Sequence, residues 1–287
     1  MRLDDERESE NVEDRRGGGG LPGGVGGVGI GATVLALVAS YFLGVNPSTL
    51  LNLVSHVGPS TVQQVPAHKP PADDHMARFV SKVLADTEDT WGEIFQKNGK
   101  TYQNPKLVLF SGGTPTACGA GRTAMGPFYC PADRKVYIDL AFYRELEQKF
   151  HAPGQFAEAY VIAHEVGHHV QNLLGISEKV HALEVKAGNK AKANAYSVRL
   201  ELQADCFAGV WGYRADHVGH RLEPGEVEQA LTAASAIGDD TLQKEAKGYA
   251  VPDSFTHGSS EQRVRWFKRG METGDVNQCN TFKAAQL

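Results

Sequence analysis

The sequence predicts an α+β fold, mainly helical with a small β-sheet, preceded by one transmembrane helix. Three observations lead to this prediction: helical spacing of apolar residues through most of the chain after Gln155, two short strand-like runs before it, and a long uncharged stretch near the N-terminus. The 287 residues carry a formal net charge of -5, and no cluster of Lys or Arg suggests a basic binding face. We therefore expect no nucleic-acid partner.

The first 24 residues are expected to be a disordered cytoplasmic tail. Residues 1–16 are dense in charge and nearly free of large apolar groups, so they cannot bury a core of their own. The glycine-rich stretch that follows is typical of a flexible linker.

Residues 25–45 are expected to form a single transmembrane helix. The stretch VGGVGIGATVLALVASYFLGV contains no charged residue and has about the 20 residues that a helix needs to cross a bilayer. A buried core helix is one alternative, but this segment is rich in glycine and is not amphipathic. A cleaved signal peptide is another, but the apolar run is long and has no evident A-x-A cleavage site.

The basic residues predict the orientation of this helix. Arg15 and Arg16 precede it, and the first basic residue after it is Lys69. The positive-inside rule therefore places the N-terminus in the cytoplasm. We expect a single-pass protein of the cytoplasmic (inner) membrane, with a linker at residues 46–73 and a folded domain at residues 74–287 on the periplasmic or extracellular side.

The folded domain is expected to open with a helix, because HMARFVSKVLADTEDTWGEIFQKNG has apolar residues at helical spacing. Two strand candidates follow, PKLVLF at residues 105–110 and VYIDL at residues 136–140. Turn-forming residues lie between them.

The run HEVGHH, residues 164–169, is a candidate metal site in a predicted helix that Gly175 ends. His164 and His168 are four residues apart, so they lie on one helix face and can both reach one zinc ion. Glu165 is placed to act as general base for a zinc-bound water. Because the same pattern also arises by chance, the motif alone leaves open an ordinary histidine-rich helix.

A second predicted helix, RLELQADCFAGVWGY, supplies a third ligand, which a catalytic zinc site needs beside its open position. Glu201 and Asp205 are also four residues apart. Glu201 can bind the zinc, and Asp205 can accept the free ring N–H of a ligand histidine. The apolar neighbours of both favour a site over a solvated helix face. Small residues on this helix would let it approach the first closely: Ala204, Ala208, Gly209 and Gly212.

HEVGHHVQ followed by ELQADCFAG resembles the neutral zinc metallopeptidases of bacteria. The pattern HExxH then ExxxD is also similar to gluzincins, including thermolysin and the HtpX-type membrane proteases. The resemblance covers most of the chain and implies a zincin-like metallopeptidase domain acting on peptide or protein substrates. It implies His164, His168 and Glu201 as zinc ligands, Glu165 as the catalytic base and Asp205 as the partner of a ligand histidine. It assigns no ligand role to His169.

The segment SFTHGSSEQRVRWF adds His257, because HtpX-type proteins carry a similar stretch after the third ligand. His257 is a candidate for stabilising the oxyanion that forms as the peptide carbonyl is attacked. The alternative is that residues 256–261 cap the last helix, with Ser259 or Ser260 as N-cap. Tyr160 and Tyr196 are further candidates for the oxyanion. By analogy with gluzincins, VYIDL is expected to be an edge strand that holds extended substrate.

The four cysteines fit an oxidising compartment. Cys118 and Cys130 flank a turn-rich segment and could close a short loop, which would leave Cys206 to pair with Cys279. Four cysteines allow three pairings, so this one is a hypothesis.

These features support a membrane-anchored zinc-dependent peptidase that hydrolyses peptide bonds through a zinc-activated water, with Glu165 as general base. The alternative is a non-catalytic zinc-binding envelope module that binds a protein partner. Structural zinc sites are usually four-coordinate and rich in cysteine, and this site is neither, which favours the enzyme.

Overall fold

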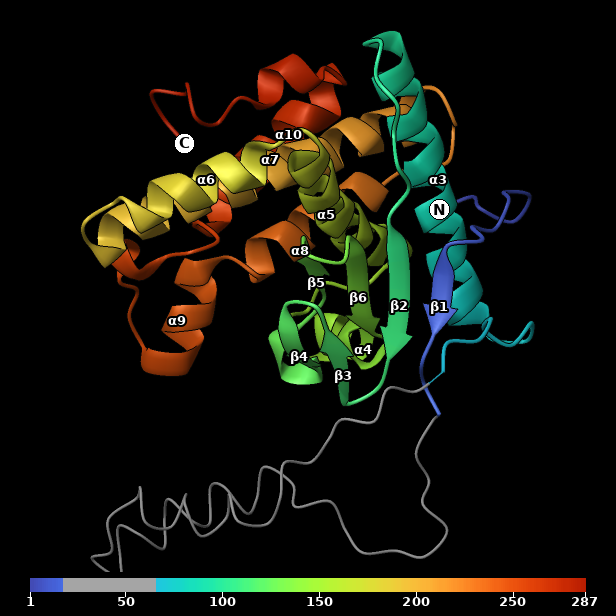
Figure 1. Ribbon diagram of the computed structural model, residues 1–287. Coiled ribbons are helices and arrows are strands. Elements are labelled where there is room, and N and C mark those ends of the chain that lie inside the picture. The colour runs from blue at the N-terminus through green and yellow to red at the C-terminus, as the bar shows by residue number, and fades with distance from the viewer. Residues whose placement is uncertain (18–65) are drawn as a thin grey trace, which may run out of the picture. The chain divides into compact units, whose positions relative to one another are not determined.

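The computed structural model describes residues 1–17 and 66–287. Within these ranges the fold is α+β, mainly helical with two small sheets (Figure 1). The main elements are β1 (Val12–Asp14), α3 (His75–Lys97), β2 (Lys106–Phe110), β3 (Gly113–Thr116), β4 (Gly119–Arg122), β5 (Phe128–Cys130), β6 (Lys135–Asp139), α4 (Ala141–Gln148), α5 (Gln155–Leu173), α6 (Ile176–Val185), α7 (Lys190–His217), α8 (Glu226–Ala236), α9 (Asp239–Lys247) and α10 (Ser260–Thr273). Short 3₁₀ helices follow β4 (Thr123–Met125), α9 (Pro252–Ser254) and α10 (Val276–Cys279).

The larger sheet has the strand order β1-β2-β6-β5. Strands β1, β2 and β6 are parallel, and β5 runs antiparallel to β6. The prediction that VYIDL is an edge strand is wrong, because β6 pairs with β2 on one side and β5 on the other. The edge beside α5 is β5. The sequence did not reveal β5 as a strand, because it has only three residues and follows directly after the turn-forming Gly126 and Pro127.

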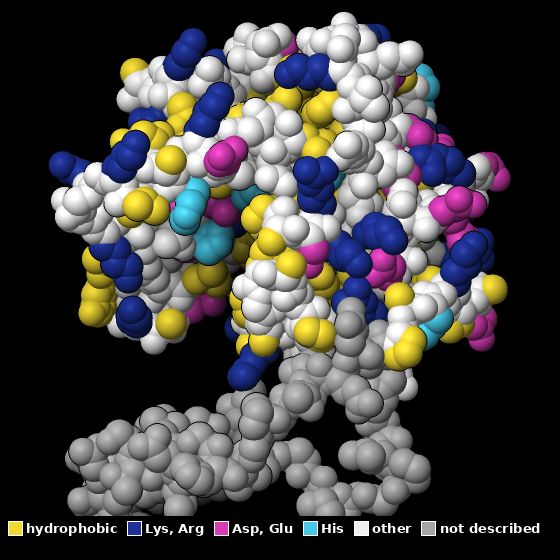
Figure 2. Space-filling model, in the orientation of Figure 1, with side chains coloured by type: hydrophobic (Ala, Val, Ile, Leu, Met, Phe, Trp, Pro, Cys, Tyr) yellow, Lys and Arg dark blue, Asp and Glu magenta, His cyan; other side chains and the backbone are white. Residues whose placement is uncertain are grey.

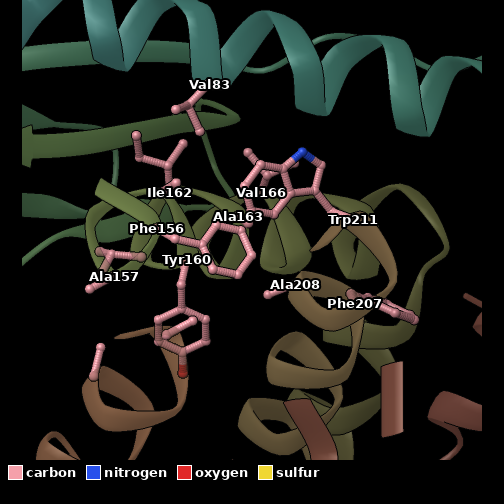
Figure 3. Close-up of a cluster of buried hydrophobic side chains, with 14 of the residues drawn as sticks. Val83, Phe156, Ala157, Tyr160, Ile162, Ala163, Val166, Phe207, Ala208 and Trp211 are labelled. Atoms are coloured by element: carbon pink, nitrogen blue, oxygen red, sulfur yellow. The ribbon is translucent and has the colours of Figure 1, made fainter. Parts of the chain in front are cut away.

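Helix α5 lies at the centre of the core. Figure 3 shows Ile162 and Val166 on the side of α5 that faces Val83 of α3, while Tyr160 points the opposite way. All four side chains are buried. Because α5 is covered on both sides, the HEVGHH motif is held in a rigid element.

Close helix crossings position the motif. A Cβ atom on Gly167 of α5 would lie 3.0 Å from the carbonyl oxygen of Ala204, so α5 and α7 touch backbone to backbone there. Gly209, which the sequence suggested for the same contact, faces α10 instead. A Cβ atom on Gly209 would overlap the carbonyl oxygen of Phe267, and one on Gly270 would overlap that of Cys206.

Both hypothesised disulfides are present. Cys118–Cys130 ties the β3–β4 hairpin to the end of β5, and Cys206–Cys279 ties the segment after α10 to α7.

The N-terminal residues differ from the disordered tail that we expected. Residues 1–16 and 67–287 form one folded unit. Strand β1 pairs with β2, and Leu3 and Val12 are buried in the core. The charges of this segment find partners on the domain, as Glu13 does with Lys135. A charge-dense segment can thus fold when another part of the chain supplies the apolar surface and the counter-charges, which local composition does not reveal.

The membrane-helix part of the fold prediction is corrected. Among residues 1–17 and 66–287, no helix is long and apolar enough to cross a membrane. The predicted span, residues 25–45, lies outside the described residues.

The predicted single-pass localisation is also corrected. One crossing between residues 25 and 45 would put the two ends of the chain on opposite sides of a membrane, yet residues 1–16 share a sheet with residues 67–287. Arg16, one of the two residues that set the orientation, forms ion pairs with Asp14 and with Asp74 of the domain.

Candidate metal centre

Helices α5 and α7 bring three potential ligands together. One ligand atom each from His164, His168 and Glu201 lies within 4.8 Å of the others. The Nε2 atoms of the two histidines are 3.2 Å apart, and Oε2 of Glu201 lies 3.2 and 3.4 Å from them. The four-residue spacing on α5 and the crossing at Gly167 produce this convergence.

The other ring nitrogens of these histidines are both held. His164 donates its Nδ1–H to Asp205 at 2.8 Å, and His168 donates its Nδ1–H to Oε1 of Gln171 at 2.9 Å. In the neutral tautomers that these bonds select, both Nε2 lone pairs point at each other and at a carboxylate. Three converging acceptors require positive charge between them, which protons or a metal ion can supply, and two imidazoles with one carboxylate are a donor set that fits a metal ion.

The carboxylates favour positive charge here. Burial disfavours a charged imidazole, but Asp205 and Glu201 outweigh it and raise the pKa of His164 to about 10. Burial would likewise raise the pKa of Glu201, but His168 and His164 hold it well below its usual range.

A buried network stands behind His164. Arg263 of α10 donates to both oxygens of Asp205 at 2.9 and 3.0 Å and to the hydroxyl of Tyr160 at 3.1 Å. Tyr160 in turn donates to Asp205 at 2.6 Å. Since its hydroxyl is engaged in this network, Tyr160 is not free to serve an oxyanion.

Glu165 lies beside the three ligands and lines the same hollow, which has a volume of about 870 Å³. Figure 2 shows histidine side chains around a hollow to the left of the middle of the face in view. Within the described residues, no hydrogen bond or ion pair engages the Glu165 carboxylate, although the residue is only 8% exposed. This carboxylate is free to exchange protons with a bound molecule.

His257 also lines this hollow, and its ring is 53% exposed. Asp239 accepts the backbone N–H groups of residues 256–258 and lies 3.4 Å from Nδ1 of His257. This contact with Asp239 raises the pKa of His257. The capping alternative is also present, because Ser259 is the N-cap of α10 in a capping box with Gln262.

Sequence reasoning set His169 apart from the ligands, and the structure agrees. Its Nε2 donates to the carbonyl oxygen of Gln103 at 2.6 Å, its Nδ1 contacts the hydroxyl of Tyr129 at 3.0 Å, and burial lowers its pKa to about 4.

Sequence reasoning did not identify Gln171 and Arg263, which hold His168 and Asp205 in place. A buried glutamine three residues after a ligand histidine is a signal that could have found Gln171, whereas Arg263 depends on how α10 packs.

A comparison with known protein families identifies the family of this chain. The family described as "Putative neutral zinc metallopeptidase" matches residues 1–282. The chain belongs to this family. A relative from Escherichia coli strain K12, the uncharacterized protein YpfJ, is 53% identical over 98% of this chain and 99% of its own length. The uncharacterized protein Mb2605 of Mycobacterium bovis is 42% identical over 73% of each chain. No solved structure matches the chain.

Membership in the neutral zinc metallopeptidase family implies Zn²⁺ as the cofactor, and His164, His168 and Glu201 form the group that can hold it. Two imidazole nitrogens and one carboxylate are the set found in catalytic zinc sites that keep a fourth position open. The family also implies a peptide substrate.

Proposed function

We propose that this protein is a zinc-dependent peptidase in which His164, His168 and Glu201 bind the zinc and Glu165 is the general base. The observation that carries the proposal is the free Glu165 carboxylate beside three converging ligands at an accessible hollow. When bound, zinc supplies a Lewis acid that polarises the peptide carbonyl and makes water easier to deprotonate.

Residues of the chain transfer the proton, orient the ligands and stabilise the oxyanion. Glu165 takes a proton from the attacking water and passes it to the leaving amine. Asp205 and Gln171 fix the two imidazole rings so that Nε2 of each faces the metal. His257, at the exposed side of the hollow, donates a hydrogen bond to the developing oxyanion.

Strand β5 is suited to hold the substrate backbone. It pairs only with β6 among the described residues, and Phe128 and Tyr129 line the hollow of the metal centre. Figure 1 places β5 at the end of the sheet nearest α5 and α8. An extended peptide can add to such an edge through its main chain.

The test combines metal content with hydrolysis of a fluorescein-labelled unstructured protein by the full chain. The parent protein is expected to hold about one zinc per chain and to hydrolyse the probe. Glu165→Gln is expected to keep the zinc and lose about 10²- to 10⁴-fold of the rate. His164→Ala is expected to lose the zinc.

Glu145→Gln is the matched control, since Glu145 lines the same hollow but is exposed on α4. It should change neither readout. A Glu165→Gln variant that hydrolyses as fast as the parent would disprove the role of Glu165. Zinc without hydrolysis in the parent would favour the non-catalytic zinc-binding module.

A further inference from the structure

A second hollow, of about 750 Å³, borders α6 on a face adjacent to the one that lines the metal centre. Its walls are the C-terminal end of α3, helix α6, part of α7 and the segment after α10. We call it the α6 groove. Val180 lines both this groove and the hollow of the metal centre, so one ten-residue helix separates the two.

The α6 groove has apolar walls that remain open to solvent. Leu183 lines it and is 42% exposed, and the partly buried Ile94, Leu174 and Val276 line it as well, so the exposed apolar surface is a patch and not a single side chain. Trp91 also lines the groove, and its buried indole N–H has no acceptor among the described residues. Figure 2 shows hydrophobic side chains next to Lys and Arg at the top of the molecule, where Figure 1 places the end of α3 and the C-terminal segment.

The charge of the α6 groove is opposite to that of the whole chain. Three lysines from separate parts of the chain line it, and no Asp or Glu does. They are Lys100 just after α3, Lys179 on α6 and Lys283 in the C-terminal segment. Within the described residues none of the three lysines forms an ion pair, although the net charge of the chain is -5. A partner for this surface should combine apolar side chains with several carboxylates.

We propose that the α6 groove is a docking site for an apolar, acidic segment of the polypeptide substrate, remote from the bond that is cleaved. This inference rests on the proposed peptidase function. A polypeptide is the occupant that fits, because the groove adjoins the metal centre along α6 and a chain bound in one can continue into the other. Three cations from separate parts of the chain also suit several carboxylates better than the single headgroup of a small amphiphile.

Binding of a fluorescent peptide to the full chain tests the proposal without turnover, in a Glu165→Gln background. The probe has about 12 residues in alternating pairs of Leu and Glu, long enough to present anchors over several turns. Charge reversal at Lys179→Glu together with Lys283→Glu is expected to weaken its Kd about tenfold. Leu183→Ser, at an exposed position, should also weaken binding. Lys268→Glu is the control, since Lys268 is exposed on α10 and outside the groove.

The same double charge reversal in the active chain is expected to raise KM for an acidic unstructured protein and to leave kcat unchanged. The proposal is overturned if a peptide with Lys in place of Glu binds as tightly, or if charge reversal leaves Kd unchanged. It is also overturned if dodecanoate binds the groove and the peptide does not, or if the chain dimerises through the groove. Loss of hydrolysis with peptide binding intact would count against the proposed function and not against the docking surface.

Discussion

Arg263 and Asp205 form a buried pair in which the guanidinium donates to both carboxylate oxygens, at 2.9 and 3.0 Å. Arg263 is 3% exposed and Asp205 is fully buried. Burial would raise the pKa of Asp205, but Arg263 and His164 hold it well below its usual range. The carboxylate that orients His164 is therefore kept charged by a residue of α10.

Arg263→Met is expected to destabilise the protein by about 3–5 kcal/mol, because it leaves the buried Asp205 carboxylate without its counter-charge. Urea unfolding of the zinc-free protein measures this. Arg265→Met is the control, since among the described residues Arg265 forms an ion pair with the exposed Glu261 and donates to the carbonyl oxygen of Leu287, and its loss should cost less than about 1 kcal/mol. Equal losses in the two variants would contradict a special role for Arg263.

Gln171→Met is expected to weaken zinc binding about 10- to 100-fold, because Nδ1 of His168 loses the acceptor that fixes its ring. Competition with a chromophoric chelator measures the affinity. Gln148→Met, at an exposed position at the end of α4, should leave it unchanged. An unchanged affinity in Gln171→Met would show that the ring of His168 is held by packing alone.

His257→Gln is expected to lower kcat about 10²- to 10³-fold with zinc content unchanged, as for the loss of one oxyanion donor. The capping box of α10 uses Ser259 and Gln262, so the helix should stay intact. His181→Gln serves as control, because His181 lines the same hollow and is 79% exposed. If kcat stays at the parent value, His257 has no part in the chemistry.

Glu158 of α5 should make stability depend on pH. Burial, and then the charge of Glu147, raise its pKa from 4.5 to about 7. The folded state therefore binds more protons than the unfolded state, and stability falls as pH rises from about 4.5 through 7. Glu158→Gln should thus raise Tm relative to the parent at pH 8 and much less at pH 5. Thermal scans at both pH values measure the change in Tm, and Glu178→Gln is the control at an exposed position of α6. An equal gain in Tm at pH 5 and pH 8 would contradict the role of Glu158.

Gly270→Ala is expected to lower the free energy of unfolding by about 1–3 kcal/mol, because the new Cβ atom would overlap the carbonyl oxygen of Cys206 and push α10 away from α7. Gly92→Ala is the matched control on α3, where a Cβ atom meets nothing within 4 Å. That change should stabilise by up to about 1 kcal/mol. Denaturant unfolding of both variants measures the contrast, and a neutral Gly270→Ala would contradict the close crossing.

Local spacing in the sequence was enough to predict several features. The four-residue intervals at His164 and His168 and at Glu201 and Asp205 place each pair on one helix face, since the helical period is a property of the backbone. The helix beginning at His75 followed from apolar periodicity, and the strand candidate at residues 105–110 corresponds to β2. The family resemblance, which rested on these motifs, is confirmed.

Other features depended on contacts between segments far apart in the chain. Strand β1 exists because residues 12–14 find a sheet edge and counter-charges about a hundred residues away. The same holds for Arg263, which reaches Asp205 only because two glycines let α10 lie directly on α7. The sequence alone determined that His164 shares a helix face with His168, and Glu201 with Asp205, because that depends on local helix geometry. Only the tertiary structure decided that these two helix faces meet, which buried groups orient the histidines, and that the N-terminal segment pairs with the edge of the sheet as β1. Those contacts depend on how separate elements pack.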